Sequence, residues 1–174
     1  MQPESPSAGA LSAQTLARAA WLVADVARRA CDEWDGAEPA RAQALALGRR
    51  ALALGTINEA AYRGAVAALG GELVPEPAEP RDHVLGDMLD RAAEAPLALT
   101  TTAVDLVVLA VRVGEHALDQ GEADAVAAAL VAAGVARATT HLVAVNLVTR
   151  DDDPRLHQAR GEVARAARAL PDDV

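Results

Sequence analysis

The sequence predicts an all-α protein, a single-domain bundle of about six or seven helices. Hydrophobic residues make up 52% of the 174-residue chain, but aromatic residues make up only 2% and Phe is absent. A core of Ala, Leu and Val suits closely packed helices better than a sandwich or barrel, which usually draws on aromatic and β-branched side chains. Apolar residues also recur every three or four positions through most of the chain, and its length fits one domain.

The first long helix is expected over residues 12–34. Leu16, Ala20, Val23, Ala27, Ala30 and Trp34 form one apolar stripe there, as in an amphipathic helix. Ser12 is a suitable N-cap for this helix. A second helix is expected from residue 39 to about residue 54, with Gly55 as its end.

The motif "TINE" predicts a new helix start after Gly55. Thr56 followed three residues later by Glu59 matches a capping box, in which each side chain bonds a backbone N–H of the other residue. The helix that it opens is expected to continue to about residue 69. Three prolines in "ELVPEPAEP", residues 72–80, then predict a loop or hinge.

The C-terminal half predicts the most buried helix. Pro96 interrupts an amphipathic segment, so we expect a kink or a new helix start there. Residues 97–117 are apolar on nearly every side, which is typical of a central helix. The β-branched residues of 104–113 raise a strand alternative, but the length and the lack of turn signals favour a helix. Two more helices are expected, over about 122–147 and 155–170.

Charge and composition exclude several classes of function. The net charge is −9 and all 16 basic residues are Arg, without a basic run, so we expect no nucleic-acid partner. The single cysteine, Cys31, excludes an internal disulfide and a CxxC metal site, and is expected to be a small core residue. The four histidines show no HxxxH or HExxH spacing, so no metal is expected.

Targeting signals are also absent from the pattern. The N-terminus lacks the basic start and apolar stretch of a signal peptide. No uncharged run approaches 18 apolar residues, as a membrane-spanning helix needs. The sequence therefore predicts a cytoplasmic protein with no membrane partner.

The segment "EAPLALTTTAVDLVVLAVRVGEHALDQGEADAVAAALVAAGVARATTHLVAVNL" resembles the C-terminal half of the cyclodeaminase/cyclohydrolase family. That family includes formiminotetrahydrofolate cyclodeaminase and methenyltetrahydrofolate cyclohydrolase. Its pattern has Val-Pro-Leu on a helix, then a Gly, then Ser-Asp before an Ala-rich helix that ends in Asn-Leu. Pro96-Leu97, Gly121, Asp124 and Asn146-Leu147 lie at the matching spacings.

The N-terminal part resembles the same family, with two departures. The family carries Pro-Gly-Gly-Gly-Ser before its first long helix, and the alignment places Gly9 on the first Gly and Ser12 on the Ser. Ala10 and Leu11 replace the other two glycines. In "NEAAYRGAVAAL", Tyr62 matches the family's aromatic residue, and Asn58 stands where the family has Asp.

The resemblance covers roughly residues 5–170 and implies a fold, an assembly and a ligand. It implies an all-helical homodimer with a folate-type pocket near the glycine stretch and the dimer interface. The reaction closes or opens a one-carbon bridge on tetrahydrofolate, which is a substrate, and no cofactor is expected. Residues 1–11 would be an N-terminal arm with a degenerate glycine loop, and residues 12–174 one helical domain.

Each candidate residue also has a structural explanation. The candidate catalytic groups are Asp124 and Glu59, although Asp124 suits the first turn of a helix and Glu59 a capping box. The candidate ligand-binding residues are Ser7, Gly9, Ser12, Asn58, Tyr62 and Asn146. Asn146 also suits a helix end, and Ser12 an N-cap.

Two hypotheses follow. The chain is an enzyme acting on a tetrahydrofolate one-carbon derivative, as a cyclodeaminase or a cyclohydrolase. Alternatively, it is a non-catalytic binding or scaffold protein, or a relative that acts on another small substrate. The lost glycines and Asn58 favour the alternative, because an amide cannot take and return a proton as a carboxylate does.

Overall fold

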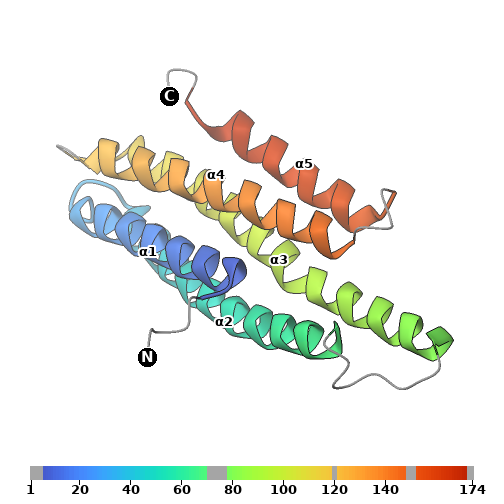
Figure 1. Cartoon of the computed structure of the whole chain (residues 1–174). Coiled ribbons are helices and arrows are strands. Elements are labelled where there is room, and N and C mark those ends of the chain that lie inside the picture. The colour runs from blue at the N-terminus through green and yellow to red at the C-terminus, as the bar shows by residue number, and fades with distance from the viewer. Residues whose placement is uncertain (1–5, 70–77, 119–120, 148–151, 172–174) are drawn as a thin grey trace.

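The computed structural model describes residues 6–69, 78–118, 121–147 and 152–171, and within these ranges every regular element is a helix. The five helices are α1 (Ala8–Arg29), α2 (Ala37–Leu69), α3 (Ala78–Gly114), α4 (Gly121–Asn146) and α5 (Pro154–Ala169). They lie lengthwise in an elongated bundle (Figure 1). The all-α prediction is confirmed, and the described part of the chain has five helices rather than six or seven.

α3 is the central helix, as its apolar sequence predicts. It packs against each of the other four helices, whereas α5 packs only against α3 and α4. Small side chains from α1, α3 and α4 fill most of the core, in which Leu99, Leu106 and Val107 are fully buried. Because Ala and Val are small, the helices approach closely enough to exclude water without aromatic residues.

The predicted break at Gly55 is wrong, because α2 continues through it. Thr56 does not cap a new helix, since its hydroxyl donates to the carbonyl of Leu52 at 3.3 Å inside α2. The glycine serves a contact between helices. A Cβ at Gly55 would lie 2.7 Å from the Cβ of Ala13, so Gly55 allows α1 and α2 to approach closely.

The predicted N-cap at Ser12 is also wrong. α1 begins at Ala8, and its N-cap is Ser7, whose hydroxyl accepts a hydrogen bond from the backbone N–H of Ala10 at 3.3 Å. Ser12 lies inside α1 and is buried. The glycine stretch is therefore the first turn of α1, and Gly9 is a helical residue.

Pro96 does not start a new helix, because α3 continues through it. Three threonines follow in the next turn, Thr100, Thr101 and Thr102. The hydroxyl of each donates to the backbone carbonyl four residues earlier. Proline has no N–H, so it cannot donate to the carbonyl of Ala92, which is its normal partner in a helix. That carbonyl needs a donor from elsewhere.

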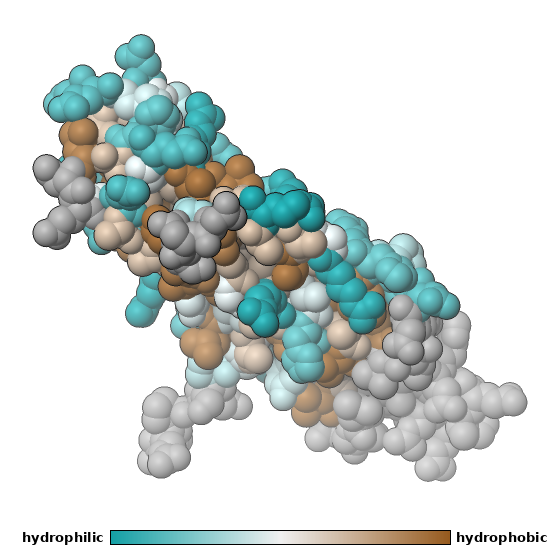
Figure 2. All heavy atoms as spheres, turned by 90° about the horizontal axis from the view of Figure 1, so that it is seen from above, coloured by the Kyte–Doolittle hydropathy of each residue, from teal (hydrophilic) through white to brown (hydrophobic). Residues whose placement is uncertain are grey.

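Two helical stretches, Gly86–Gly114 and Gly121–Asn146, are long and apolar enough to cross a membrane by length and composition alone. Core helices of soluble proteins share these properties. In this protein, the most apolar 18-residue segment of the first stretch is 56% buried and that of the second is 39% buried. On the face seen in Figure 2, apolar side chains are interspersed with polar ones over the part that is coloured by hydropathy. The absence of a membrane partner stays a prediction.

Candidate functional site

A cavity of about 220 Å³ lies where the N-terminus of α1 meets α2, α3 and α4. It has mostly apolar walls with a few polar groups, as small-molecule sites usually do. The lining residues are Ser7, Ala8, Gly9, Asn58, Tyr62, Ala65, Ala92, Leu142, Val145 and Asn146. Five of the residues predicted from the sequence are among them, brought together from three separate helices or their ends.

Gly9 and Asn58 touch inside this cavity. A Cβ on Gly9 would lie 2.1 Å from Nδ2 of Asn58 and 2.7 Å from its Oδ1. Such distances are far inside van der Waals contact, so only glycine at position 9 leaves room for this amide. Gly9 is therefore required for the close approach of α1 to a side chain of α2, and not for an unusual backbone angle.

Asn58 is a buried residue whose side-chain amide lines the cavity. Its residue exposure is 8%, and it has no hydrogen-bond partner among the described residues. Every fully buried side-chain N or O atom described has a partner, so the amide of Asn58 must be open to the cavity. A polar group in this position is normally bound by water or by a ligand.

Ser7 and Glu59 form a hydrogen-bonded pair beside the cavity. The Ser7 hydroxyl donates to Oε2 of Glu59 at 2.5 Å, a length typical of a hydroxyl bound to a charged carboxylate. Glu59 itself lines a neighbouring groove of about 360 Å³, together with Arg63. The Nε of Arg63 lies 3.8 Å from Oε1 of Glu59. Ser7 thus connects the cavity to the nearest carboxylate.

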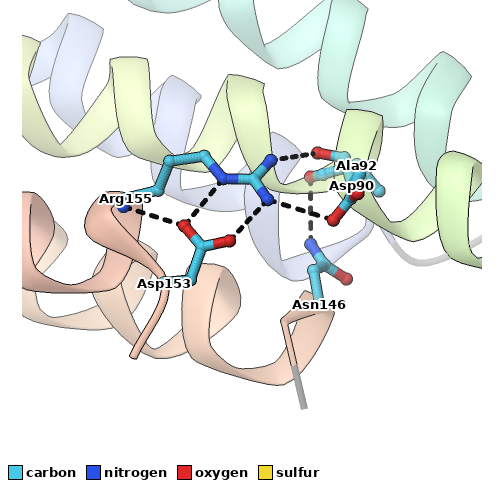
Figure 3. A network of polar contacts seen from close by, with 5 residues as sticks. All are labelled: Asp90, Ala92, Asn146, Asp153 and Arg155. Atoms are coloured by element: carbon cyan, nitrogen blue, oxygen red, sulfur yellow. Dashed lines mark hydrogen bonds and ion pairs between the residues drawn. The ribbon is translucent and has the colours of Figure 1, made fainter. Parts of the chain in front are cut away.

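Asn146 lies at the C-terminal end of α4, in the wall opposite α1. Its Nδ2 donates to the carbonyl of Ala92 at 2.9 Å, the carbonyl that Pro96 leaves without a helical donor. Figure 3 shows this bond beside the polar network of Asp90, Asp153 and Arg155. The side chain is therefore held in one orientation at the cavity wall.

Two departures from the glycine pattern do not close the cavity. Leu11 is 55% exposed and does not line it. Ala10 lines the neighbouring groove instead. Tyr62 lines the cavity with 53% of the residue exposed, so its ring stands at the mouth.

Asp124 and Ser12 do not join this site. The carboxylate of Asp124 bonds Arg29 at 2.8 Å near the other end of α1. Arg29 and Gly9 are 20 residues apart on one helix, which corresponds to about 30 Å. Ser12, one turn into α1, lines neither the cavity nor the groove. Of the two predicted carboxylates, only Glu59 lies beside the cavity.

An arginine network that the sequence analysis missed lies next to Asn146. Arg155 bonds both carboxylate oxygens of Asp153, at 3.0 and 2.7 Å, and also Oδ1 and the carbonyl oxygen of Asp90, at 3.0 and 3.1 Å. Asp153 is the N-cap of α5. "DDDPR" was the available signal, because an acidic residue before Pro suits a helix start. No signal in the sequence indicates Asp90, the partner of Arg155 on α3, because the two residues are 65 positions apart.

Other notable side chains lie apart from the cavity. Cys31 is exposed, so its predicted place in the core is wrong. The ring of His116 stacks on Trp34 with centroids 4.4 Å apart, and the guanidinium of Arg112 lies over the same indole. In the described part of the chain, no three His, Cys, Asp or Glu side chains gather in a way that could hold a metal ion.

The comparison with protein families decides the relationship. Residues 2–165 match the family model described as formiminotransferase-cyclodeaminase. The chain belongs to this family. The cyclodeaminase resemblance stated from the sequence is therefore confirmed.

The fold matches a solved member. The crystal structure of formiminotetrahydrofolate cyclodeaminase from Thermotoga maritima superposes with a TM-score of 0.74. The match covers 98% of this chain and 90% of that chain, at 19% sequence identity. At this identity the likeness establishes the shared fold. The comparison with curated proteins found no match.

Proposed function

We propose that this cyclodeaminase-family protein binds a tetrahydrofolate one-carbon derivative in the cavity and acts on it as a cyclodeaminase or a cyclohydrolase. One observation carries the proposal. Of the six ligand-binding residues predicted from distant parts of the sequence, Ser7, Gly9, Asn58, Tyr62 and Asn146 line one cavity and Ser12 does not. The homodimer and the cytoplasmic location that the family implies stay predictions.

The Ser7–Glu59 pair supplies a route for protons. Closing a one-carbon bridge by loss of ammonia takes a proton from the attacking nitrogen and gives one to the leaving amine. In our proposal the Ser7 hydroxyl accepts the ligand's proton while it passes its own to Glu59, so Ser7 ends unchanged and Glu59 ends neutral. The reverse transfer then protonates the leaving amine. The 2.5 Å contact supports this assignment.

The first prediction tests this route. We expect the purified protein to form 5,10-methenyltetrahydrofolate from 5-formiminotetrahydrofolate, or to hydrolyse the methenyl compound, both followed by the methenyl absorbance. Glu59→Gln keeps the shape but cannot accept a proton, so kcat should fall about 10²- to 10⁴-fold with little change in KM.

Matched variants separate this outcome from others. Glu94→Gln makes the same change at an exposed position of α3 and should keep the wild-type rate. Asp124→Asn tests the other predicted carboxylate. A loss of rate in Asp124→Asn, with none in Glu59→Gln, would overturn the assignment to Glu59.

One observation favours the alternative, a family member that is non-catalytic or acts on another small substrate. The cavity wall contains no carboxylate among its described residues, and Asn58 occupies the position of the family's Asp by resemblance. A protein of this kind would bind a ligand there without transferring its protons.

The second prediction discriminates between these functions. Asn58→Asp places a carboxylate at the cavity, where the N-terminus of α1 favours negative charge. If Asn58 is the reason for weak chemistry, this variant should raise kcat at least about tenfold over wild type. A rate equal to wild type, with ligand affinity retained, would show that position 58 does not limit the reaction.

A further inference from the structure

The carbonyl of Ala92 is the starting point, because α3 gives it no donor. In a regular helix the N–H of residue 96 would bond this oxygen, but Pro96 has none. The donor comes instead from α4, where Nδ2 of Asn146 lies 2.9 Å away (Figure 3). Asn146, at the end of α4, thus supplies the hydrogen bond that the Ala92 carbonyl of α3 lacks because residue 96 is proline.

This bond fixes which end of the Asn146 amide faces which way. The NH₂ and the oxygen of an asparagine side chain have nearly the same shape, and the partner decides the orientation. A carbonyl accepts only from the NH₂ end. The oxygen, Oδ1, is therefore turned away from Ala92 (Figure 3), and it has no donor among the described residues.

We propose that Pro96, through Ala92, positions Asn146 as a fixed hydrogen-bond acceptor of the cavity, which selects ligands with an N–H donor. Asn146 and Ala92 both line the cavity, with the apolar Leu142 and Val145 beside them. An acceptor set in an apolar wall penalises a ligand that cannot donate to it. The class of ligand, a fused pyrimidine ring, rests on the proposed function, whereas the positioning does not.

A double-mutant cycle tests the positioning. Asn146→Asp replaces the donor by an oxygen and leaves Ala92 without a partner, so the Tm should fall by about 5 °C. In the Pro96→Ala background the backbone N–H of residue 96 can bond Ala92, so the same substitution should cost less than half as much. Gln43→Glu, an amide-to-carboxylate change on the exposed face of α2, controls for added charge.

Two small ligands test the selection. Pterin presents N–H donors on its pyrimidine edge, at N3 and at the 2-amino group. 1,3-Dimethyllumazine has the same pteridine ring system, with a carbonyl in place of the 2-amino group and methyl groups on both pyrimidine nitrogens, so this edge has no N–H donor. Wild-type protein should bind pterin at least about tenfold more tightly than it binds 1,3-dimethyllumazine. Pro96→Ala frees the Asn146 amide to turn, so pterin affinity should fall about tenfold while dimethyllumazine affinity stays unchanged. A merely structural role of Pro96 would not produce this difference between ligands.

The outcomes separate this inference from the proposed function. Equal Tm losses from Asn146→Asp in both backgrounds would overturn the positioning, and wild-type protein without a preference for pterin would overturn the selection. If folate derivatives are not converted but the cycle and the pterin preference hold, the inference stands and the proposed reaction fails. If they are converted and Pro96→Ala leaves KM unchanged, the reaction stands and the inference fails.

Discussion

Gly9→Ala should weaken ligand binding in the cavity strongly while leaving the helices and the stability intact. The new Cβ would lie 2.1 Å from Nδ2 of Asn58, so the amide must leave its place. The Cβ would also lie 2.4 Å from Cγ of Asn58, so the whole amide group has to turn away. Ala favours the helix over Gly by about 1 kcal/mol, which offsets this cost. We therefore expect an unchanged or raised Tm, together with an affinity for 5,10-methenyltetrahydrofolate lowered about 10- to 100-fold.

Gly134→Ala is the matched control. Gly134 lies on the exposed side of α4, and a Cβ there would meet nothing within 4 Å. The same substitution should raise stability by a similar amount and leave affinity unchanged. Gly9→Val enlarges the clash and should bind no ligand. Wild-type affinity in Gly9→Ala, measured by thermal shift or titration calorimetry, would show that Asn58 and Gly9 do not form the binding site.

The fold class could be predicted because the helical signal is local. The helical pattern places α4 and α5 to within a residue, and the all-round apolar stretch of 97–117 predicts a central helix. It also predicts α1, but over residues 12–34, whereas the helix spans Ala8–Arg29. The boundaries were harder, because caps compete. Ser7 and Ser12 are both suitable N-caps, and α1 begins at Ala8 with Ser7 as its N-cap.

Local stop signals failed where contacts between helices outweighed them. Gly55 reads as a helix end, yet it lies where α1 comes within contact distance of α2. Pro96 reads as a break, yet packing holds α3 together across it. A residue that destabilises a helix locally is tolerated when the surrounding helices bury apolar surface on both sides of it.

Part of the candidate site could be predicted, but its chemistry could not. Of the eight residues predicted for it, Ser7, Gly9, Asn58, Tyr62 and Asn146 line the cavity, Glu59 lies beside it, and Ser12 and Asp124 lie elsewhere. The bonds that define their roles join residues more than 50 positions apart, Ser7 to Glu59 and Asn146 to Ala92. No local pattern contains such pairs, because they depend on how the helices lie against one another.

Arg155→Met should destabilise the α5 region strongly, lowering the free energy of unfolding by about 2–4 kcal/mol. The side chain of Asp153 is 7% exposed and that of Arg155 is 26% exposed. Removing the guanidinium takes two charge-assisted hydrogen bonds from the buried carboxylate of Asp153 and two hydrogen bonds from Asp90. Arg155→Lys keeps the charge but loses the bidentate contact with Asp153. Its free energy of unfolding should therefore lie between those of Arg155→Met and the wild type.

This contribution should not vary with pH near neutrality. The hydrogen bonds to Asp153, and next those to Asp90, raise the pKa of Arg155 above its ordinary value, against the opposing effect of burial. A raised pKa stabilises the folded state below the unfolded-state pKa, and the effect is lost only as pH rises through the folded-state value. Both values lie far above neutral, so the arginine stays charged and its contribution stays complete.

Arg165 offers a control on the same pair of helices. It bonds Asp105 on α3 and Glu162 on α5, both at 2.9 Å, but its own side chain is 45% exposed. Water screens such a pair, so Arg165→Met should cost less than about 1 kcal/mol. Urea unfolding followed by circular dichroism measures both. Equal losses in the two variants would contradict the argument, because burial of the paired carboxylate, rather than the number of ion pairs, is what should make Arg155 matter.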